Sequence, residues 1–123
     1  MENKYFDHAA TTAVREEVIK EMIPYMGVEY GNPSSVYSLG RKNRKVVENA
    51  RAKVAQIINS NKNEIYFTSC GSESDNLAIK GIMFANKFKG NHMITTKIEH
   101  PAILNTCKWL ERNGFEVTYL NVD

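Results

Sequence analysis

One short stretch of small residues suits the binding of an anionic ligand. Residues 69–72, with the sequence Ser-Cys-Gly-Ser, lie between a β-rich run and an apolar helical segment. Small residues let the backbone approach a ligand, and the free N–H groups and positive dipole at a helix start favour a phosphate. Glu73 would crowd such a phosphate, and the stretch matches neither a Walker A loop nor GxGxxG. A plain strand–helix turn therefore stays open beside a phosphate site.

A histidine occupies the corresponding place after the next β-rich run. His100 precedes Pro101, which disfavours helical geometry for the residue before it, so the imidazole can project into a crevice. An imidazole there could stack on a flat cofactor or act as an acid or base near neutral pH. A helix-capping or solvated histidine remains the alternative. His8 and His92 are weaker candidates, and His92 opens a strand at its amino end, where a structural role is expected.

Other kinds of active site find no support in the residue pattern. Cys70 and Cys107 form no CxxC pair and have no histidine at ligand spacing, so no metal site is predicted. No GxSxG elbow is present, and neither cysteine lies in a Cys/His motif.

The first half of the chain is predicted to be helical around one loop. An extended arm, residues 1–12, leads to a helix from Val14 to Met26, with Thr11 or Thr12 as its cap and Pro24 near its end. A loop rich in Gly, Asn, Pro and Ser follows at residues 27–38, and then a long amphipathic helix over residues 40–58.

The second half alternates between strands and helices. Helices are expected at 73–88, which is apolar nearly all round and should be buried on most sides, and from Pro101 to about Asn113. Gly90 and Gly114 are the expected helix ends, and strands are expected at 65–68, 92–96 and 115–120. Strands joined by helices imply a parallel sheet, in which ligands bind at the carboxyl ends of the strands. That rule selects residues 69–72 and His100.

Composition and charge exclude several classes. With 123 residues, 42% of them hydrophobic, and a net charge of +2, the chain is an ordinary globular domain without a strong attraction for nucleic acid or membrane. The basic stretch Arg41–Lys45 is expected to be a solvated helix face. The first residues carry no apolar signal core, no run approaches the ~20 apolar residues of a membrane span, and the cysteine usage favours a reducing, cytoplasmic location.

Five ordered motifs resemble those of the cysteine desulfurase family, class V aminotransferase-like enzymes that depend on pyridoxal 5′-phosphate (PLP). The similarity covers nearly the whole chain with the family's spacing. The motifs are Tyr5–Thr12, Gly31–Ser35 with Gly40-Arg41, Phe67–Ser69 with Glu73–Gly81, Ile98–Ala102, and Gly114–Val117.

The resemblance implies an α/β fold, part of a three-layer fold-type-I PLP-transferase large domain with parallel βαβ units, an N-terminal arm and a long helix. Residues 1–38 would form the arm, first helix and loop, and residues 39–123 the long helix and the start of the large domain. Family members are homodimers that convert L-cysteine to L-alanine and an enzyme persulfide, which supplies sulfur to an acceptor or scaffold protein for iron–sulfur cluster assembly. By position, Gly71 and Ser72 would hold the PLP phosphate, and His100 would lie against the pyridine ring as the catalytic residue, with Thr96 and Glu99 as supporting neighbours.

The sequence also departs from the family's pattern. The usual loop is Gly-Ala-Thr, whereas Cys70 adds a side chain at its first position and Ser72 keeps only the hydroxyl of the usual threonine. No lysine matches the family's Schiff-base motif, and the chain stops just past a strand, which favours an N-terminal segment that is inactive alone. A non-catalytic scaffold or dimerisation module and a selenocysteine lyase-type relative remain alternatives.

Overall fold

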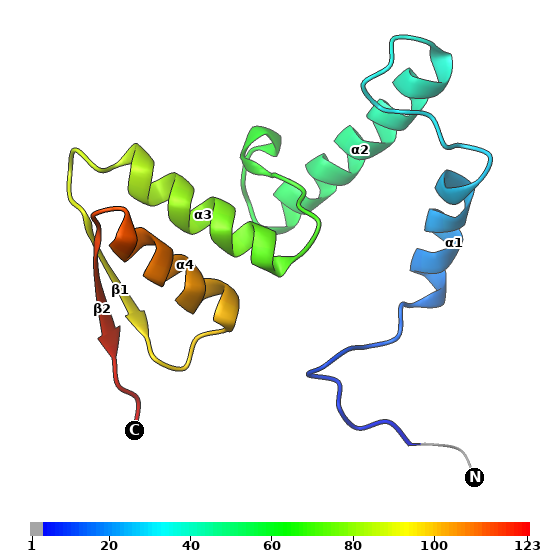
Figure 1. The fold of residues 1–123 in the computed structure, drawn as a ribbon. Helices are drawn as coiled ribbons and strands as arrows, with labels where there is room; N and C mark the ends of the chain where they lie inside the picture. Colours follow the sequence, from blue (N-terminus) through cyan, green and yellow to red (C-terminus); the bar gives the residue numbers. More distant parts are fainter. Residues whose placement is uncertain (1–3) are drawn as a thin grey trace. The chain divides into compact units, whose positions relative to one another are not determined.

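The computed structural model describes residues 4–123, which form two compact units (Figure 1). One unit ends at Tyr66 and the other spans Phe67–Asp123. The first contains helices α1 (Glu16–Met26) and α2 (Ser38–Ile57) and a 3-10 turn, η1 (Lys62–Glu64). The second contains α3 (Gly71–Ala85), β1 (His92–Thr96), α4 (Pro101–Arg112) and β2 (Glu116–Leu120). The element types agree with the predicted ones except at residues 65–68.

Helix α1 begins later than its predicted cap. Its N-cap residue is Arg15, whose side chain makes no capping hydrogen bond to any described residue, so the predicted cap at Thr11 or Thr12 is wrong. Glu16 and Glu17 lie in the first turn, where their charge is favourable beside the positive end of the helix dipole. Pro24 lies inside the helix, and the helix ends two residues beyond it.

The loop between α1 and α2 is fastened to α2 by one buried amide. Asn43 is 7% exposed. Its Nδ2 donates to the carbonyl of Glu29 at 2.6 Å and also to that of Gly31. Lys42 forms an ion pair with Glu29. The basic stretch is mostly exposed, as predicted, and in addition it holds the loop.

A glycine in α2 allows the same loop to approach the helix, which leads to a paired prediction. A Cβ added at Gly40 would lie 2.5 Å from the carbonyl oxygen of Ser35, whereas one added at Gly81 in α3 would meet nothing within 4 Å. We expect Gly40→Ala to lower the free energy of unfolding by about 1–3 kcal/mol through overpacking. Gly81→Ala should raise it by roughly 0.5–1 kcal/mol, because alanine loses less conformational freedom in a helix. Denaturant unfolding followed by circular dichroism would measure both, and equal effects would contradict the close approach at Gly40.

The two strands of the second unit pair in parallel, as predicted. The register runs from His92 opposite Glu116 to Thr96 opposite Leu120. Helix α4 connects them and begins at Pro101. Gly114 has φ +82° after the helix end, a conformation that glycine adopts without steric cost, so the prediction of a terminal glycine is confirmed.

The predicted strand at residues 65–68 is wrong. Ile65 has extended backbone angles, φ −97° and ψ 124°, but the sheet in the described residues contains only β1 and β2. A strand exists only where its backbone groups pair with a neighbour, and β-rich composition cannot supply that neighbour. The predicted helix end at Gly90 is also wrong, since α3 ends at Ala85 with Asn86 as its C-cap.

The core of the second unit lies under α4. Leu110 and Cys107 are 0% exposed and Phe115 is 4% exposed. Phe84 of α3 packs against Trp109 and Phe115, with ring centroids 5.8 and 5.0 Å apart. The remaining apolar surface of α3 is open, with Leu77 54% and Ile82 63% exposed. The predicted burial of α3 on most sides is therefore wrong for this chain, because α4 is its main packing partner among the described elements.

Candidate functional site

The start of α3 is a braced turn. Both the backbone N–H and the hydroxyl of Ser69 donate to Glu73 Oε2, each at 2.6 Å. The hydroxyl of Thr68 lies 2.6 Å from that of Ser74 and donates to the carbonyl of Cys70 at 3.2 Å. These contacts join the residues just before the helix to its first turn, so the backbone at residues 69–72 is held in one shape.

The donors at Gly71 and Ser72 fit a phosphate group. The first backbone hydrogen bond around α3 is donated by Ser74 to the carbonyl of Cys70, at 3.1 Å. The amides of Gly71 and Ser72 precede it, and helix geometry leaves such amides without an intrahelical acceptor. A Cβ built on Gly71 meets no described atom within 4 Å, so the space beside this turn is open. Amides, a serine hydroxyl and a helix start together form a donor set for an anion.

Two ionisable groups at this turn have lowered pKa values. The pKa of Glu73 falls because the Ser69 hydroxyl and amide hydrogen-bond to its ionised form. The pKa of Glu73 is lower in the folded chain than in the unfolded chain. The hydrogen bonds from Ser69 to Glu73, called the clamp below, therefore stabilise the fold above the ordinary pKa of glutamate, and this stabilisation is lost as the pH falls through the folded pKa. The pKa of the exposed Cys70 thiol is lowered chiefly by the Glu73 backbone amide and next by the Ser69 hydroxyl.

His100 is the N-cap residue of α4. Its backbone is extended, with φ −58° and ψ 146°, as expected before proline. Its Nδ1 accepts a hydrogen bond from the amide of Ala102 at 3.1 Å, so in the neutral ring the proton is on Nε2. The side chain therefore caps the helix, which was the alternative expected from the sequence, while the residue remains exposed. Among the predicted neighbours, Thr96 donates to Glu99 at 2.9 Å.

Helices α3 and α4 bring the two predicted segments to one end. Phe84, near the end of α3, contacts Trp109, near the end of α4. Lys80, one turn earlier, lies 4.4 Å from the Trp109 ring centroid, and Asn76 shares a groove with Ala102. The helices therefore run in the same direction and begin at the same end, as Figure 1 shows. Ser72 lies one turn before Asn76, and His100 lies two residues before Ala102, so both belong to that end.

The other histidines make structural contacts. His92 Nε2 lies 2.7 Å from the Thr118 hydroxyl on the neighbouring strand, in agreement with the structural role predicted for it. The His8 ring packs edge-on against Tyr5, with centroids 5.3 Å apart. Within residues 4–123, no cluster of three or more His, Cys, Asp or Glu side chains has the arrangement of a metal site. No helix in the same range has the length and apolar content needed to span a membrane.

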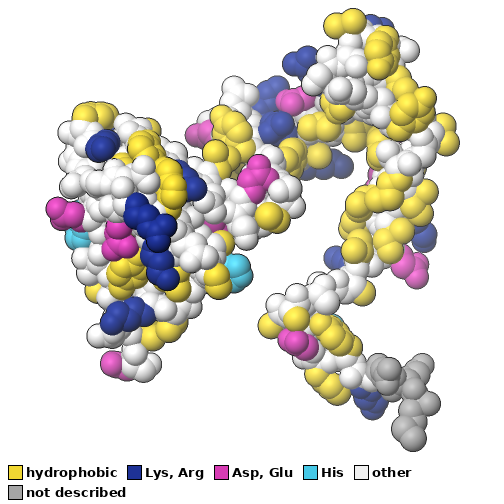
Figure 2. Space-filling model, in the orientation of Figure 1, with side chains coloured by type: hydrophobic (Ala, Val, Ile, Leu, Met, Phe, Trp, Pro, Cys, Tyr) yellow, Lys and Arg dark blue, Asp and Glu magenta, His cyan; other side chains and the backbone are white. Residues whose placement is uncertain are grey.

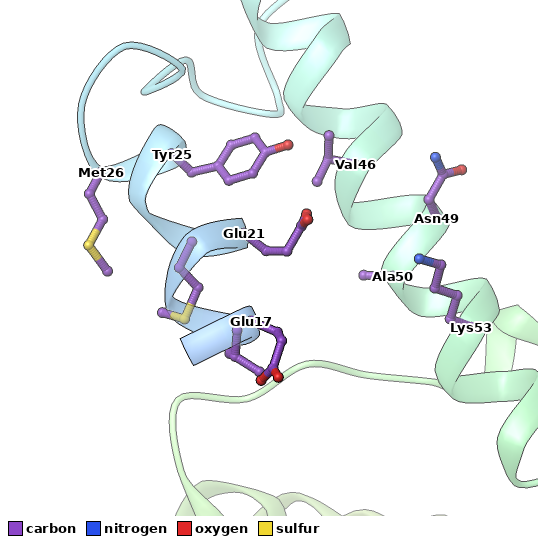
Figure 3. A pocket seen from close by; sticks show the side chains of 10 residues that line it. Glu17, Glu21, Tyr25, Met26, Val46, Asn49, Ala50 and Lys53 are labelled. Atoms are coloured by element: carbon purple, nitrogen blue, oxygen red, sulfur yellow. The ribbon is translucent and has the colours of Figure 1, made fainter. Parts of the chain in front are cut away.

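A groove in the first unit contains none of the predicted site residues. It measures about 700 Å³ and is lined by α1 and α2. Figure 3 shows Glu21 and Tyr25 directed toward Val46 and Ala50. Figure 2 shows hydrophobic side chains along α1. Val18 and Met22 of this helix are 45% and 46% exposed. Size alone does not make the groove a catalytic centre, and the ionisable side chains in its lining, Glu17, Glu21 and Lys53, are exposed.

Sequence reasoning missed the clamp between Glu73 and Ser69. Glutamate three residues after an N-cap is the signature of a capping box, in which its carboxylate reaches back to the start of the helix. Cys70 holds the N-cap position and Glu73 the third helical position, so the spacing was present in the sequence. The observed bond reaches one residue further back, to Ser69.

Known proteins with similar sequences are cysteine desulfurases. The chain is 57% identical to "Cysteine desulfurase IscS" of Methanosarcina thermophila over 99% of its own length and 31% of that protein's. It is 58% identical to the protein of the same name from Clostridium botulinum strain Hall, over 97% of this chain and 30% of the relative. The chain thus spans about 30% of the length of these curated relatives.

Solved structures show the same fold over this part of the chain. A "NIFS-LIKE PROTEIN" superimposes with a TM-score of 0.87 at 41% identity, over 94% of this chain and 32% of that one. "SspA in complex with cysteine" gives a TM-score of 0.87 at 42% identity, over 96% of this chain and 34% of that one. The described residues therefore form part of the fold-type-I α/β architecture of PLP-dependent enzymes, as predicted.

A family model described as "Aminotransferase class-V" matches residues 4–123, which include both ends of the helix pair. Enzymes of this family work with PLP, and the anion donors at Gly71 and Ser72 fit its phosphate. The match covers nearly the whole chain, and the sequence relatives and fold agree with it. The chain belongs to the aminotransferase class-V family.

Proposed function

We propose that this chain supplies the phosphate-binding turn and the ring-facing histidine of the PLP site in a cysteine desulfurase. The observation that carries the proposal is the shared end of the parallel helices α3 and α4, where Gly71, Ser72 and His100 lie. The names of the relatives support the choice of reaction.

Each residue would have a distinct task at this site. The amides of Gly71 and Ser72 and the Ser72 hydroxyl would hold the phosphate at the positive end of α3. His100 would lie against the pyridine ring and orient it, and its Nε2, which the capping bond does not use, would take or release a proton. PLP supplies the electron sink, whereas these side chains contribute binding, orientation and proton transfer.

The substrate and partners follow from the same family assignment. L-Cysteine is the proposed substrate, with L-alanine as a product and the sulfur passed to an acceptor or scaffold protein for iron–sulfur cluster assembly. A homodimer in the cytoplasm is the proposed assembly and location. The choice of substrate is supported by the names of the relatives and by the similar fold of SspA, whose structure is a complex with cysteine.

We further propose that the chain is the amino-terminal segment of such an enzyme and does not turn over by itself. Catalysis requires a lysine that links to PLP and a cysteine that carries the sulfur. Lys80 and Lys87 lie over the rings of Trp109 and Phe115 instead, with Nζ 4.4 and 5.0 Å from the ring centroids. Cys70 is the N-cap residue of α3, so its backbone would form part of the proposed phosphate turn and its thiol would not carry the sulfur.

Cofactor binding and turnover can be measured separately. We expect PLP to bind the chain in equilibrium dialysis and to be displaced by inorganic phosphate. Ser72→Ala should weaken PLP binding by roughly tenfold, because it removes a hydrogen bond to a charged group. Ser38→Ala is the matched control, since Ser38 also opens a helix. Alanine release from L-cysteine should stay at background. Equal PLP affinity in the wild type and Ser72→Ala would refute the phosphate site, and enzymatic alanine release would refute the inactive segment.

A self-associating, non-catalytic module is the second candidate. Ile94 and Leu77 are 61% and 54% exposed, and the described sheet has two strands, so each strand has a free edge. Uncovered apolar faces and free edges favour association with another chain. Light scattering on the chain at high concentration tests this candidate, and a clean monomer would count against it.

A further inference from the structure

The carboxylate of Glu73 has a position that the phosphate site itself does not explain. A negative side chain in the first turn of α3 opposes the binding of a phosphate at the same helix start. Its Oε2 nevertheless accepts two hydrogen bonds of 2.6 Å from Ser69, one from the amide and one from the hydroxyl. Two short bonds to one ionised oxygen are strong interactions for an exposed turn.

The N-cap residue of α3 does not itself provide a strong hydrogen-bond acceptor for the start of the helix. Cys70 occupies the N-cap position, where Ser, Thr, Asp or Asn would accept a hydrogen bond from the helix. A thiol is a weak acceptor, and the Cys70 side chain makes no capping hydrogen bond of ordinary geometry within the described part of the chain. The Glu73 carboxylate instead accepts hydrogen bonds from Ser69, the residue before Cys70, and so joins the first turn of α3 to the segment that precedes it.

We propose that Glu73 is a positioning residue, whose carboxylate clamps Ser69 so that the Gly71 and Ser72 amides stay directed at the cofactor phosphate. This inference rests on the proposed function and adds the device that shapes its phosphate turn. The bond partners of Glu73 lie before the helix, so the clamp uses none of the donors that the phosphate needs. The contact between Thr68 and Ser74 braces the same turn from a second pair of residues.

Substitution of Glu73 separates the clamp from a simple effect of charge. Glu73→Gln removes the charge but keeps an oxygen that can accept from Ser69, whereas Glu73→Ala removes both. Asp75→Ala is the matched control, because Asp75 carries the same charge near the start of α3 without a hydrogen bond to the turn.

The ligand-free chain provides the first measurement. We expect amide hydrogen exchange at Ser69 to become at least about fivefold faster in Glu73→Ala, because its acceptor is lost. Exchange at Ser69 should stay within about twofold of the wild type in Glu73→Gln and in Asp75→Ala. Unchanged exchange in Glu73→Ala would overturn the clamp.

The second measurement is a titration with PLP and one with inorganic phosphate. Binding is monitored through the NMR chemical shifts of the Gly71 and Ser72 amides. Glu73→Ala should weaken binding of both probes by about three- to tenfold, since the turn loses its shape, and Glu73→Gln should bind at least as tightly as the wild type. Tighter binding by both Glu73 variants would show that the carboxylate acts only by repulsion and would overturn the proposal. Failure of the wild type to bind either probe would refute the proposed function, while Ser69 exchange would still decide whether Glu73 holds the turn.

Discussion

Brief treatment of the native chain with iodoacetamide should modify Cys70 and leave Cys107 free. Cys70 is exposed, and its thiol pKa is lowered by the amide of Glu73 and the hydroxyl of Ser69. Since the thiolate is the reacting form, a lower pKa raises the reactive fraction near neutral pH. Cys107 is 0% exposed, and burial raises its pKa, with Glu111 and Glu99 adding to the effect.

The expected difference in rate is large. Cys107 reacts only when the second unit opens, and an opening that costs about 3 kcal/mol slows the reaction by more than 100-fold. Mass spectrometry of peptides after short labelling would give both rates. Cys70→Ser should remove the fast modification, and unfolding in urea should make the two rates of the wild-type chain similar. Equal rates in the native chain would contradict the packing of α4 against the strands. The rate of Cys70 modification can also be measured as a function of pH. A midpoint at or above the ordinary thiol pKa of about 8.5 would contradict the lowering of the Cys70 pKa by the α3 amides.

Leu110→Ala should cause the largest loss of stability among single substitutions in the second unit. Leu110 is 0% exposed and lies in α4 beside Cys107 and Phe115. Removal of a fully buried leucine side chain costs about 2–5 kcal/mol, because buried apolar surface is lost and a cavity remains. A unit of this size has little stability in reserve, so the variant should be substantially unfolded at 25 °C.

The fluorescence of Trp109 reports this change selectively. It is the only tryptophan of the chain, and it contacts Phe84 with ring centroids 5.8 Å apart. Urea titrations of the wild type, Leu110→Ala and Leu77→Ala would give the comparison. Leu77 is 54% exposed, so its substitution should cost well under the Leu110 value. Similar small losses in both variants would show that α4 does not provide the core.

Local signals in the sequence predicted most elements of the fold. Apolar spacing placed α2 and α4, Pro101 marked the first residue of α4, and Gly114 marked its end. The β1 strand has the predicted bounds, residues 92–96. These features depend on neighbours within a few positions, which is the range over which a sequence pattern carries direct information.

Two of the errors concern features that depend on distant partners. Residues 65–68 have β-rich composition but no strand beside them in the described sheet, and α3 has the apolar surface of a buried helix but one main packing partner. The cap of α1 was also misplaced, because a threonine that could cap a helix says nothing about where the helix begins.

The candidate site was located from the sequence through residue types and the rule for parallel sheets, with the family resemblance assigning Gly71, Ser72 and His100 their expected roles. The sequence did not reveal the hydrogen bonds from Ser69 to Glu73, and it left open whether His100 caps α4, which it does by accepting from the Ala102 amide. In both cases the side chain could form hydrogen bonds of similar energy with several partners. The backbone geometry of the folded chain determines which partner lies within reach.

The sequence by itself determined the helix periodicity, the proline and glycine boundaries, the parallel strand order and the family to which the chain belongs. All of these rest on short-range sterics and on motif spacing along the chain. Only the tertiary structure decided that α3 and α4 begin at the same end, that Leu110 and Cys107 form the centre of the core, and that Glu73 closes the turn. These arrangements arise when segments separated in sequence compete for the same apolar contacts and hydrogen bonds, and that competition is settled only in the packed chain.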